Sequence, residues 1–220
     1  MQAPRPDGGK ASTSRDRFLV AAAEEFVEDG YDRCTIRAVA ARAGTSLASF
    51  SRNWADKRQL FAELFELHFA PINREQLDAF AALQRRGDAR LANYIAGFYA
   101  PVLEPRFVDA RPIASHKVYC QALADPSPEV KQLVRPLVTE VRSRLIGIVR
   151  AHLPALDDQA VFLAMNVIHG TYLYAQQQGD RLAGIMGIDV QQVDWGGAAR
   201  TLAEMAVSGI SGTAPADRTR

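Results

Sequence analysis

The stretch TIRAVAARAGTSLASFSRNWADKRQLF, residues 35–61, predicts two short helices joined by a tight turn. In its first part four apolar residues recur at helical spacing and form one face: Ile36, Val39, Ala40 and Ala43. Thr35 stands where a helix N-cap belongs, and Gly44 can adopt the left-handed conformation that ends such a helix. The first helix is therefore expected to end at the Ala-Gly pair.

The second helix is expected over residues 47–53, after an N-cap at Thr45 or Ser46. It buries Phe50, and Trp54 continues the same side. A helix this short is marginal in water, so packing against the rest of the chain must hold it, and its outer face is free for a partner. Two short helices across a glycine turn are typical of a helix-turn-helix, whose second helix enters the major groove of DNA.

The local charge supports the same hypothesis. The chain has 220 residues and a net charge of +1, so no global field draws it to nucleic acid. Between residues 33 and 58, however, Asp56 is the only acid beside six basic residues: Arg33, Arg37, Arg42, Arg52, Lys57 and Arg58. This basic surface suits contact with phosphates, and it is also compatible with a solvated face that binds nothing.

Residues 17–61 resemble the N-terminal block of the TetR family of bacterial transcriptional regulators. The matching motifs are Phe-x-x-x-Gly-Tyr from Phe26, Thr-x-x-x-Val-Ala-x-x-Ala-Gly from Thr35, and Lys-x-x-Leu from Lys57. The resemblance implies an all-α protein with a three-helix DNA-binding domain and a larger helical domain that binds ligand and forms a dimer. The expected organisation is a disordered tail over 1–13, the helix-turn-helix domain over 14–60, the ligand-binding and dimerisation domain over 61–210, and a disordered tail over 211–220.

The residues expected to bind DNA include departures from the family pattern. Ser51 stands where the family usually has a phosphate-contacting Tyr, and Trp54 replaces the usual Phe. Leu47 replaces a polar or basic residue, which suggests an apolar base contact such as a thymine methyl, or none. The residues expected to face the bases are Thr45, Ser46, Leu47, Ala48, Ser49 and Asn53. Those expected on the phosphates are Thr35, Arg37, Arg42, Ser51, Arg52 and Lys57.

Apolar residues beyond Leu60 also recur at spacings of 3 and 4, without the alternation typical of strands, so about nine helices are expected in all. Pro71 is expected to break the helix that starts at Lys57, and Gly179 is another predicted joint. Three helices have candidate N-caps at Ser127, Asp157 and Asp194.

The larger domain carries polar aromatic and imidazole groups on apolar helix faces. These are candidates for a mostly apolar ligand pocket, although each is also compatible with an ordinary core position: Tyr94, Phe98, Tyr99, His116, Tyr119, Met165, Asn166, His169 and Tyr172. Helices 157–178 and 194–209 are rich in small residues that permit close approach, which predicts a homodimer through a four-helix interface. The alternative is that these two helices pack only internally.

Several classes of function find no support in the sequence. It has none of the common hydrolase, metalloprotease or nucleotide-binding motifs, and its four histidines lack metal-ligand spacing, so no cofactor or metal is expected. Cys34 and Cys120 stand far apart without a CxxC pattern, which favours a reduced cytoplasmic setting. The sequence shows neither the apolar core of a signal peptide nor an apolar run long enough to span a membrane, so a soluble protein is expected.

The sequence therefore predicts a ligand-responsive transcriptional regulator, most often a repressor in the resembled family. It is expected to bind a pseudo-palindromic double-stranded operator as a homodimer and to be released by a small, mostly apolar effector. The alternative is an all-helical ligand-binding or scaffolding protein whose helix-turn-helix does not read DNA.

Overall fold

The computed structural model describes residues 13–87, 89–103 and 115–212, and every regular element in these ranges is a helix. This confirms the predicted all-α class. The chain divides into two compact units, residues 1–64 and 65–220. The predicted boundary after residue 60 and the observed division both lie within one helix. Apart from Thr13, Ser211 and Gly212, the two predicted tails lie outside the described residues.

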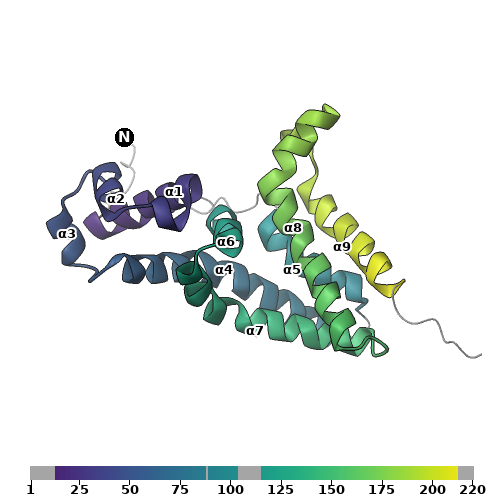
Figure 1. Cartoon of the computed structure of the whole chain (residues 1–220). Helices are drawn as coiled ribbons and strands as arrows, with labels where there is room; N and C mark the ends of the chain where they lie inside the picture. The colour runs from purple at the N-terminus through teal and green to yellow at the C-terminus, as the bar shows by residue number, and fades with distance from the viewer. Residues whose placement is uncertain (1–12, 88, 104–114, 213–220) are drawn as a thin grey trace, which may run out of the picture. The chain divides into compact units, whose positions relative to one another are not determined.

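The first unit, residues 1–64, contains α1 (Ser14–Arg33), α2 (Ile36–Arg42), α3 (Leu47–Ser51) and the start of α4 (Lys57–Arg86). α1, α2 and α3 all contact one another, and Figure 1 shows them grouped at the purple end of the chain. The rings of Phe18, Phe50 and Trp54 meet in the core, with centroids 5.6 to 5.8 Å apart.

Local signals set the ends of these helices. Thr13 and Asp16 form a capping box that starts α1. Gly30, at φ 75° and ψ 175°, interrupts the helical backbone before Tyr31, a conformation that a side chain disfavours. The predicted N-cap of α2 is confirmed, because the Thr35 hydroxyl accepts a hydrogen bond from the amide of Ala38 at 3.1 Å.

The predicted break at Pro71 is wrong, because α4 is continuous from Lys57 to Arg86. A proline inside a helix removes one donor and crowds the preceding turn, at a cost of about 3 kcal/mol. Beyond Pro71 the helix buries Ile72 and Phe80 almost completely. Packing of these side chains offsets the local cost, so the helix continues.

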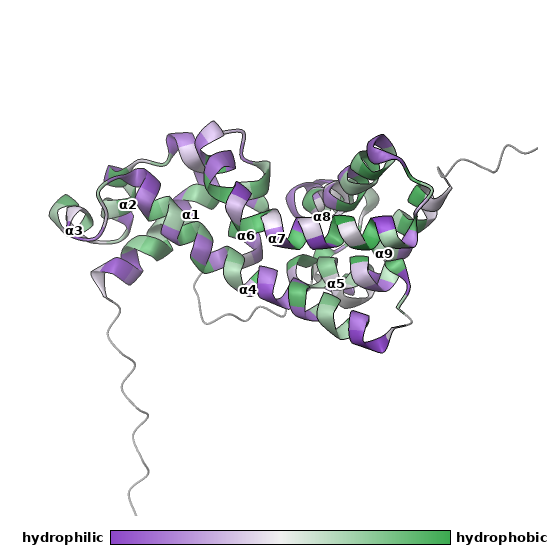
Figure 2. Ribbon diagram, turned by 90° about the horizontal axis from the view of Figure 1, so that it is seen from below, coloured by the Kyte–Doolittle hydropathy of each residue, from purple (hydrophilic) through white to green (hydrophobic). Residues whose placement is uncertain are grey.

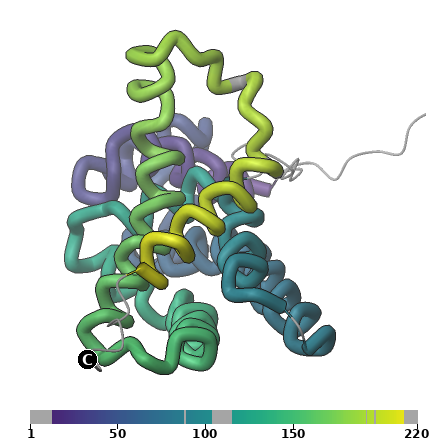
Figure 3. The backbone as a smooth tube through the Cα atoms, turned by 90° about the vertical axis from the view of Figure 1, so that its right-hand side faces the viewer, coloured from purple at the N-terminus to yellow at the C-terminus, as the bar shows by residue number. Residues whose placement is uncertain are grey.

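The second unit, residues 65–220, contains the rest of α4 and six further elements. These are α5 (Leu91–Leu103), α6 (Ser115–Ala124), α7 (Pro128–His152), α8 (Asp158–Met186), the short 3-10 helix η1 (Val190–Gln192) and α9 (Trp195–Ser211). α5 contacts α7, α8 and α9, and α8 also contacts α9. Figure 3 shows α8 in green and α9 in yellow side by side.

The predicted caps in this unit have mixed outcomes. Asp157 and Asp194 cap α8 and α9 through hydrogen bonds from Ala160 and Gly197, which confirms both predictions. Ser127 makes no side-chain cap on α7. Its amide instead donates to Asp125, and the helix starts on Pro128.

The α8 helix is longer than predicted. It continues through Gly179 to Met186 and ends on Gly187, which has a left-handed φ of 67°. A glycine inside a helix costs only about 1 kcal/mol relative to alanine, so Gly179 does not by itself end the helix. The predicted range 157–178 is therefore too short at its carboxyl end.

Candidate nucleic-acid interface and effector site

The turn between α2 and α3 is held by specific hydrogen bonds. Gly44 has a φ of 59°, which lets the chain reverse after Ala43. Arg17 on α1 donates to the Gly44 carbonyl at 3.4 Å, and the Thr45 amide donates to the Ala40 carbonyl at 3.0 Å. These contacts fix the direction in which α3 leaves the turn.

The inner side of the five-residue α3 is anchored by Phe50, which is 6% exposed. Trp54, just beyond the helix, is also buried, and its indole N–H donates to Glu63 at 2.9 Å. Arg15 pairs with the same carboxylate at 2.8 Å. The predicted burial of Phe50 and Trp54 is confirmed. α3 ends at Ser51 rather than Asn53.

The outer side of α3 carries the residues predicted to face bases. Ser46, Leu47, Ala48 and Asn53 are exposed, with Leu47 at 46%, whereas Thr45 and Ser49 are half-buried. Ser46 caps α3, because its hydroxyl accepts from the Ser49 amide at 3.2 Å. The Thr45 hydroxyl oxygen is buried without a hydrogen-bond partner among the described residues. Most of this face is accessible, and the Thr45 hydroxyl is the least accessible of the predicted groups.

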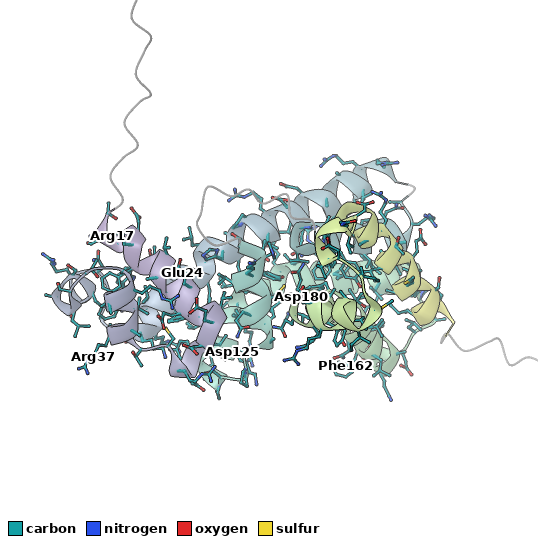
Figure 4. The ribbon with its side chains drawn as sticks, turned by 90° about the horizontal axis from the view of Figure 1, so that it is seen from above. Arg17, Glu24, Arg37, Asp125, Phe162 and Asp180 are labelled. Carbon is teal, nitrogen blue, oxygen red and sulfur yellow. The ribbon has the colours of Figure 1, made fainter. Side chains whose placement is uncertain are left out.

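Five of the six residues predicted on phosphate are exposed, and four of these five are not held by an acidic side chain among the described residues: Thr35, Arg37, Ser51 and Arg52. Arg37 projects from α2 away from the ribbon in Figure 4, and its guanidinium makes no ion pair with a described residue. Arg52 donates to the Ser49 hydroxyl at 2.8 Å, and the Ser51 hydroxyl donates to the Leu47 carbonyl at 3.2 Å. These side chains are placed where a duplex backbone can reach them.

The other two predicted phosphate residues, the exposed Arg42 and the half-buried Lys57, are held by contacts within the protein. Arg42 pairs with Glu25 at 2.8 Å and with both oxygens of Glu28 at 2.6 and 2.9 Å, while Glu24 lies 3.7 Å away. The Lys57 ammonium donates to the Tyr31 carbonyl and lies 4.0 Å above the centre of the Tyr31 ring. These contacts fasten α2 and α4 to α1, a role that charge counting in the sequence missed.

In the second unit, four of the predicted pocket residues form one aromatic cluster. The rings of Phe98, Tyr99, His169 and Tyr172 contact one another, with centroids 5.3 to 6.1 Å apart. This set is called the aromatic cluster below. The Tyr99 and Tyr172 hydroxyls are buried without a hydrogen bond of ordinary geometry among the described residues.

His169 supplies a defined acceptor to this cluster. Its Nδ1 lies 2.7 Å from the Met165 carbonyl, which can only accept, so Nδ1 carries the hydrogen. Burial is the main cause that lowers the pKa of His169, to about 4, so the ring is neutral near pH 7. Nε2 is then an acceptor, and it is buried with no partner among the described residues. Burial also raises the pKa of Tyr99 to about 12, which keeps its hydroxyl protonated.

The remaining predicted pocket residues lie in different surroundings. Tyr119 is buried and stacks on Phe69 at 4.4 Å, and burial lowers the pKa of half-buried His116. Tyr94 packs instead against His152 and Phe80. Asn166 is exposed on α8 and donates to the Phe162 carbonyl, so the structure does not bring it into the aromatic cluster. Met165, which accepts from His169, is buried beside the cluster.

One polar residue of this core was missed in the sequence. Gln76 is fully buried on α4 and donates to the Phe98 carbonyl at 2.8 Å, while its side-chain oxygen has no partner among the described residues. Gln76 is itself polar, so only its helical register with Ile72 and Phe80 marks it as a core residue.

In the described part of the chain, no three His, Cys, Asp or Glu side chains are grouped closely enough to hold a metal ion. Cys34 and Cys120 are both free and buried, and burial raises their pKa values to about 11 and about 12. None of the described helices combines the length and the apolar composition that crossing a membrane requires.

The anchored helix pair and its accessible outer face define a helix-turn-helix protein of the DNA-binding class. Residues 18–64 match the family model described as bacterial regulatory proteins of the tetR family. Residues 96–209 match the model described as the tetracyclin repressor-like C-terminal domain. The chain belongs to the TetR family, and it is a DNA-binding transcriptional regulator rather than an enzyme.

Two similar sequences match less than a third of this chain. An uncharacterized HTH-type transcriptional regulator of Mycobacterium tuberculosis is 41% identical over 59 residues, which are 27% of this chain and 31% of that protein. The DNA-binding transcriptional repressor TetR of Mycobacteroides abscessus is 32% identical over 69 residues, 31% of this chain and 36% of that protein. The match thus spans about a third of the length of either relative.

Solved structures extend the likeness of fold to most of the chain. A transcriptional regulator from Rhodococcus sp. RHA1 superposes with a TM-score of 0.59 at 18% identity, covering 90% of this chain and 97% of that one. FadR from Bacillus subtilis, solved in complex with stearoyl-CoA, superposes with a TM-score of 0.57 at 18% identity, covering 88% and 97%. At these identities the likeness concerns the fold alone.

Proposed function

We propose that this regulator is a repressor that binds a pseudo-palindromic operator as a homodimer and is released by a small, mostly apolar effector. The observation that carries the proposal is the division of α3 into two sides. Phe50 fixes the inner side in the core, while Leu47 and its neighbours leave the outer side open to solvent. In a helix-turn-helix this outer side enters the major groove.

The contacts with DNA divide into two groups. Ser46, Leu47, Ala48, Ser49 and Asn53 would read base edges, with Thr45 at the rim of the set. Thr35, Arg37, Ser51 and Arg52 would bind phosphates, because their polar groups are exposed. We assign Arg42 and Lys57 mainly to holding the helices together, since carboxylates and a backbone carbonyl already bind them. In this assignment Arg42 does not make the phosphate contact that was predicted from its charge.

The dimer would form through α8 and α9. At about 100° per residue, Leu163, Val167, Tyr174 and Ile185 fall within a stripe about 40° wide along α8. All four are at least 47% exposed, with Ile185 at 85%. Exposed apolar residues on this scale are typical of an interface. Figure 2 shows the apolar residues of α8 and α9 in green, and Phe162 at the start of α8 is labelled in Figure 4.

The predicted helices 157–178 and 194–209 are part of this proposed interface, which reaches further along α8 to Ile185. A symmetric dimer places the two copies of α3 about one turn of DNA apart, roughly 34 to 36 Å. An effector that favours a conformation with different spacing would weaken operator binding by population shift.

The effector would bind in the second unit at the aromatic cluster. A cluster that is mainly apolar but contains two buried tyrosine hydroxyls and a ring-nitrogen acceptor suits a mostly apolar molecule with a few polar atoms. The stearoyl-CoA bound to the structural relative makes fatty chains the first compounds to test.

A fluorescence-anisotropy titration tests the proposal with labelled DNA from just upstream of the gene for this protein. We expect binding at physiological salt that survives an excess of random duplex. Each neutralised phosphate contributes about 0.9 to the slope of log affinity against log salt concentration, so Arg37→Gln should lower the slope of the dimer by about 2. Arg42→Gln is the matched control and should leave the slope unchanged.

Sequence-independent binding that salt abolishes would overturn the proposal. It would favour the alternative of a helical ligand-binding protein whose helix-turn-helix does not read DNA.

A further inference from the structure

A basic groove lies between α6 and α7, and none of its lining residues belongs to the aromatic cluster. It encloses about 440 Å³, which is within the range of small-molecule sites. Three of its lining side chains are cationic, Lys131, Arg135 and Arg142, and none is an acid, so the groove has one sign of charge.

The register of α7 explains this separation of charge. At about 100° per residue, Lys131, Arg135 and Arg142 fall within about 40° of one another around the helix. The two acids of α7, Glu129 and Glu140, lie about 120° or more from all three. Nothing on their own helix therefore neutralises the three cations, and they make no ion pair with any described residue.

The groove also has an apolar floor. Val134 and Val138, one turn apart on α7, are buried between the cations, and Leu123 closes the side formed by α6. A free inorganic anion would not use these side chains. A ligand with both a charged group and a hydrocarbon chain would use the cations and the floor together.

Arg142 connects this groove to the aromatic cluster. It is half-buried, unlike the exposed Lys131 and Arg135. Burial raises the pKa of Tyr172 and lowers that of His169, and the charge of Arg142 acts on both groups. The guanidinium therefore stands beside the proposed effector site as well as in the groove.

We propose that the groove binds the anionic head group, a carboxylate or phosphate, of an amphipathic effector through Lys131, Arg135 and Arg142, with its chain on Val134 and Val138. The proposal rests on the proposed function of the second unit as an effector-binding unit. The planar guanidinium of Arg142 can bind two oxygens of either head group at once.

Isothermal titration of the full-length protein without DNA tests this proposal with four probes: octyl phosphate, octanoate, 1-octanol and inorganic phosphate. A charge-assisted contact predicts that octyl phosphate and octanoate bind at least about tenfold more tightly than 1-octanol. The contribution of the chain predicts that octyl phosphate also binds at least about tenfold more tightly than inorganic phosphate.

Three variants locate the effect. Arg142→Gln should bring the Kd values for octyl phosphate and 1-octanol within about threefold of each other. The paired change Lys131→Gln with Arg135→Gln involves only exposed residues, so it tests the groove even if Arg142→Gln disturbs folding. Arg144→Gln, on an exposed part of α7 outside this groove, is the matched control and should keep the full preference.

Equal affinity for 1-octanol and octyl phosphate would overturn the proposal, and so would failure of both anions to bind. The proposal would also be overturned if Arg142→Gln and the paired variant both kept the full preference for octyl phosphate over 1-octanol. Affinity for inorganic phosphate equal to that for octyl phosphate would show a free-anion site and refute the amphipathic ligand. Because the titration contains no DNA, failure of operator binding would refute the proposed function and leave this result standing.

Discussion

Phe50→Ala is expected to release α3 from the first unit. Phe50 is the only buried side chain on this five-residue helix. It is 6% exposed, and its ring packs against those of Phe18 and Trp54. Burying a Phe side chain contributes about 1.5 to 3 kcal/mol, and the cavity left by its removal adds to the loss. We expect a destabilisation of about 3 kcal/mol, at the lower end of Phe→Ala values, because α3 can move away rather than leave a rigid cavity.

Urea unfolding followed by Trp54 fluorescence measures this change. The chain has two tryptophans, Trp54 in the first unit and Trp195 in the second, so a Trp195→Phe background isolates the signal. Leu47→Ala is the control on the same helix, and its 46% exposure predicts a loss of no more than about 0.5 kcal/mol. A loss below about 1 kcal/mol for Phe50→Ala would refute the view that this ring anchors α3.

Two further outcomes are expected. Hydrogen bonding from Arg42 lowers the pKa of Glu28 below its ordinary 4.5. The stabilisation that this ion pair gives the folded protein is therefore present above about pH 4.5 and is lost as the pH falls through the lowered pKa. The difference in melting temperature between the unchanged protein and Arg42→Gln should therefore shrink in acid, and a difference independent of pH would contradict the ion-pair role. Ile185→Glu should convert the proposed dimer to a monomer, as measured by light scattering. Gln132→Glu, which changes an exposed residue on α7, is the control and should leave the dimer intact. A dimer that persists in Ile185→Glu would contradict the proposed interface.

The helix-turn-helix could be predicted from the sequence because its signals are local. The apolar spacing around Val39, the cap at Thr35 and the glycine at 44 act within a few residues of one another, and each is present in the structure. The burial of Phe50 and Trp54 followed from the same periodicity.

Features that depend on distant partners could not be predicted. The charge of Arg42 suggested a phosphate contact, but its carboxylate partners lie 14 to 18 residues earlier on α1. Pro71 and Gly179 are usually helix breakers, yet both lie within helices. Burial of Ile72 and Phe80 offsets the cost of Pro71, and a glycine inside a helix costs only about 1 kcal/mol. Periodicity placed the predicted pocket residues on apolar helix faces. Only the fold shows that Tyr94 and Asn166 lie outside the aromatic cluster.

Selection of bound duplexes from a randomised library tests the central claim most directly, because it asks whether the outer face of α3 reads bases. The unchanged protein should select a two-fold symmetric site. Leu47→Ala, which leaves Phe50 in the core, should relax the preference at one base pair in each half-site by several-fold and keep the others. Identical preferences for the two proteins, with affinity lowered equally for all sequences or not at all, would contradict a base contact by Leu47. A library with no selected sequence would contradict DNA reading by α3 altogether.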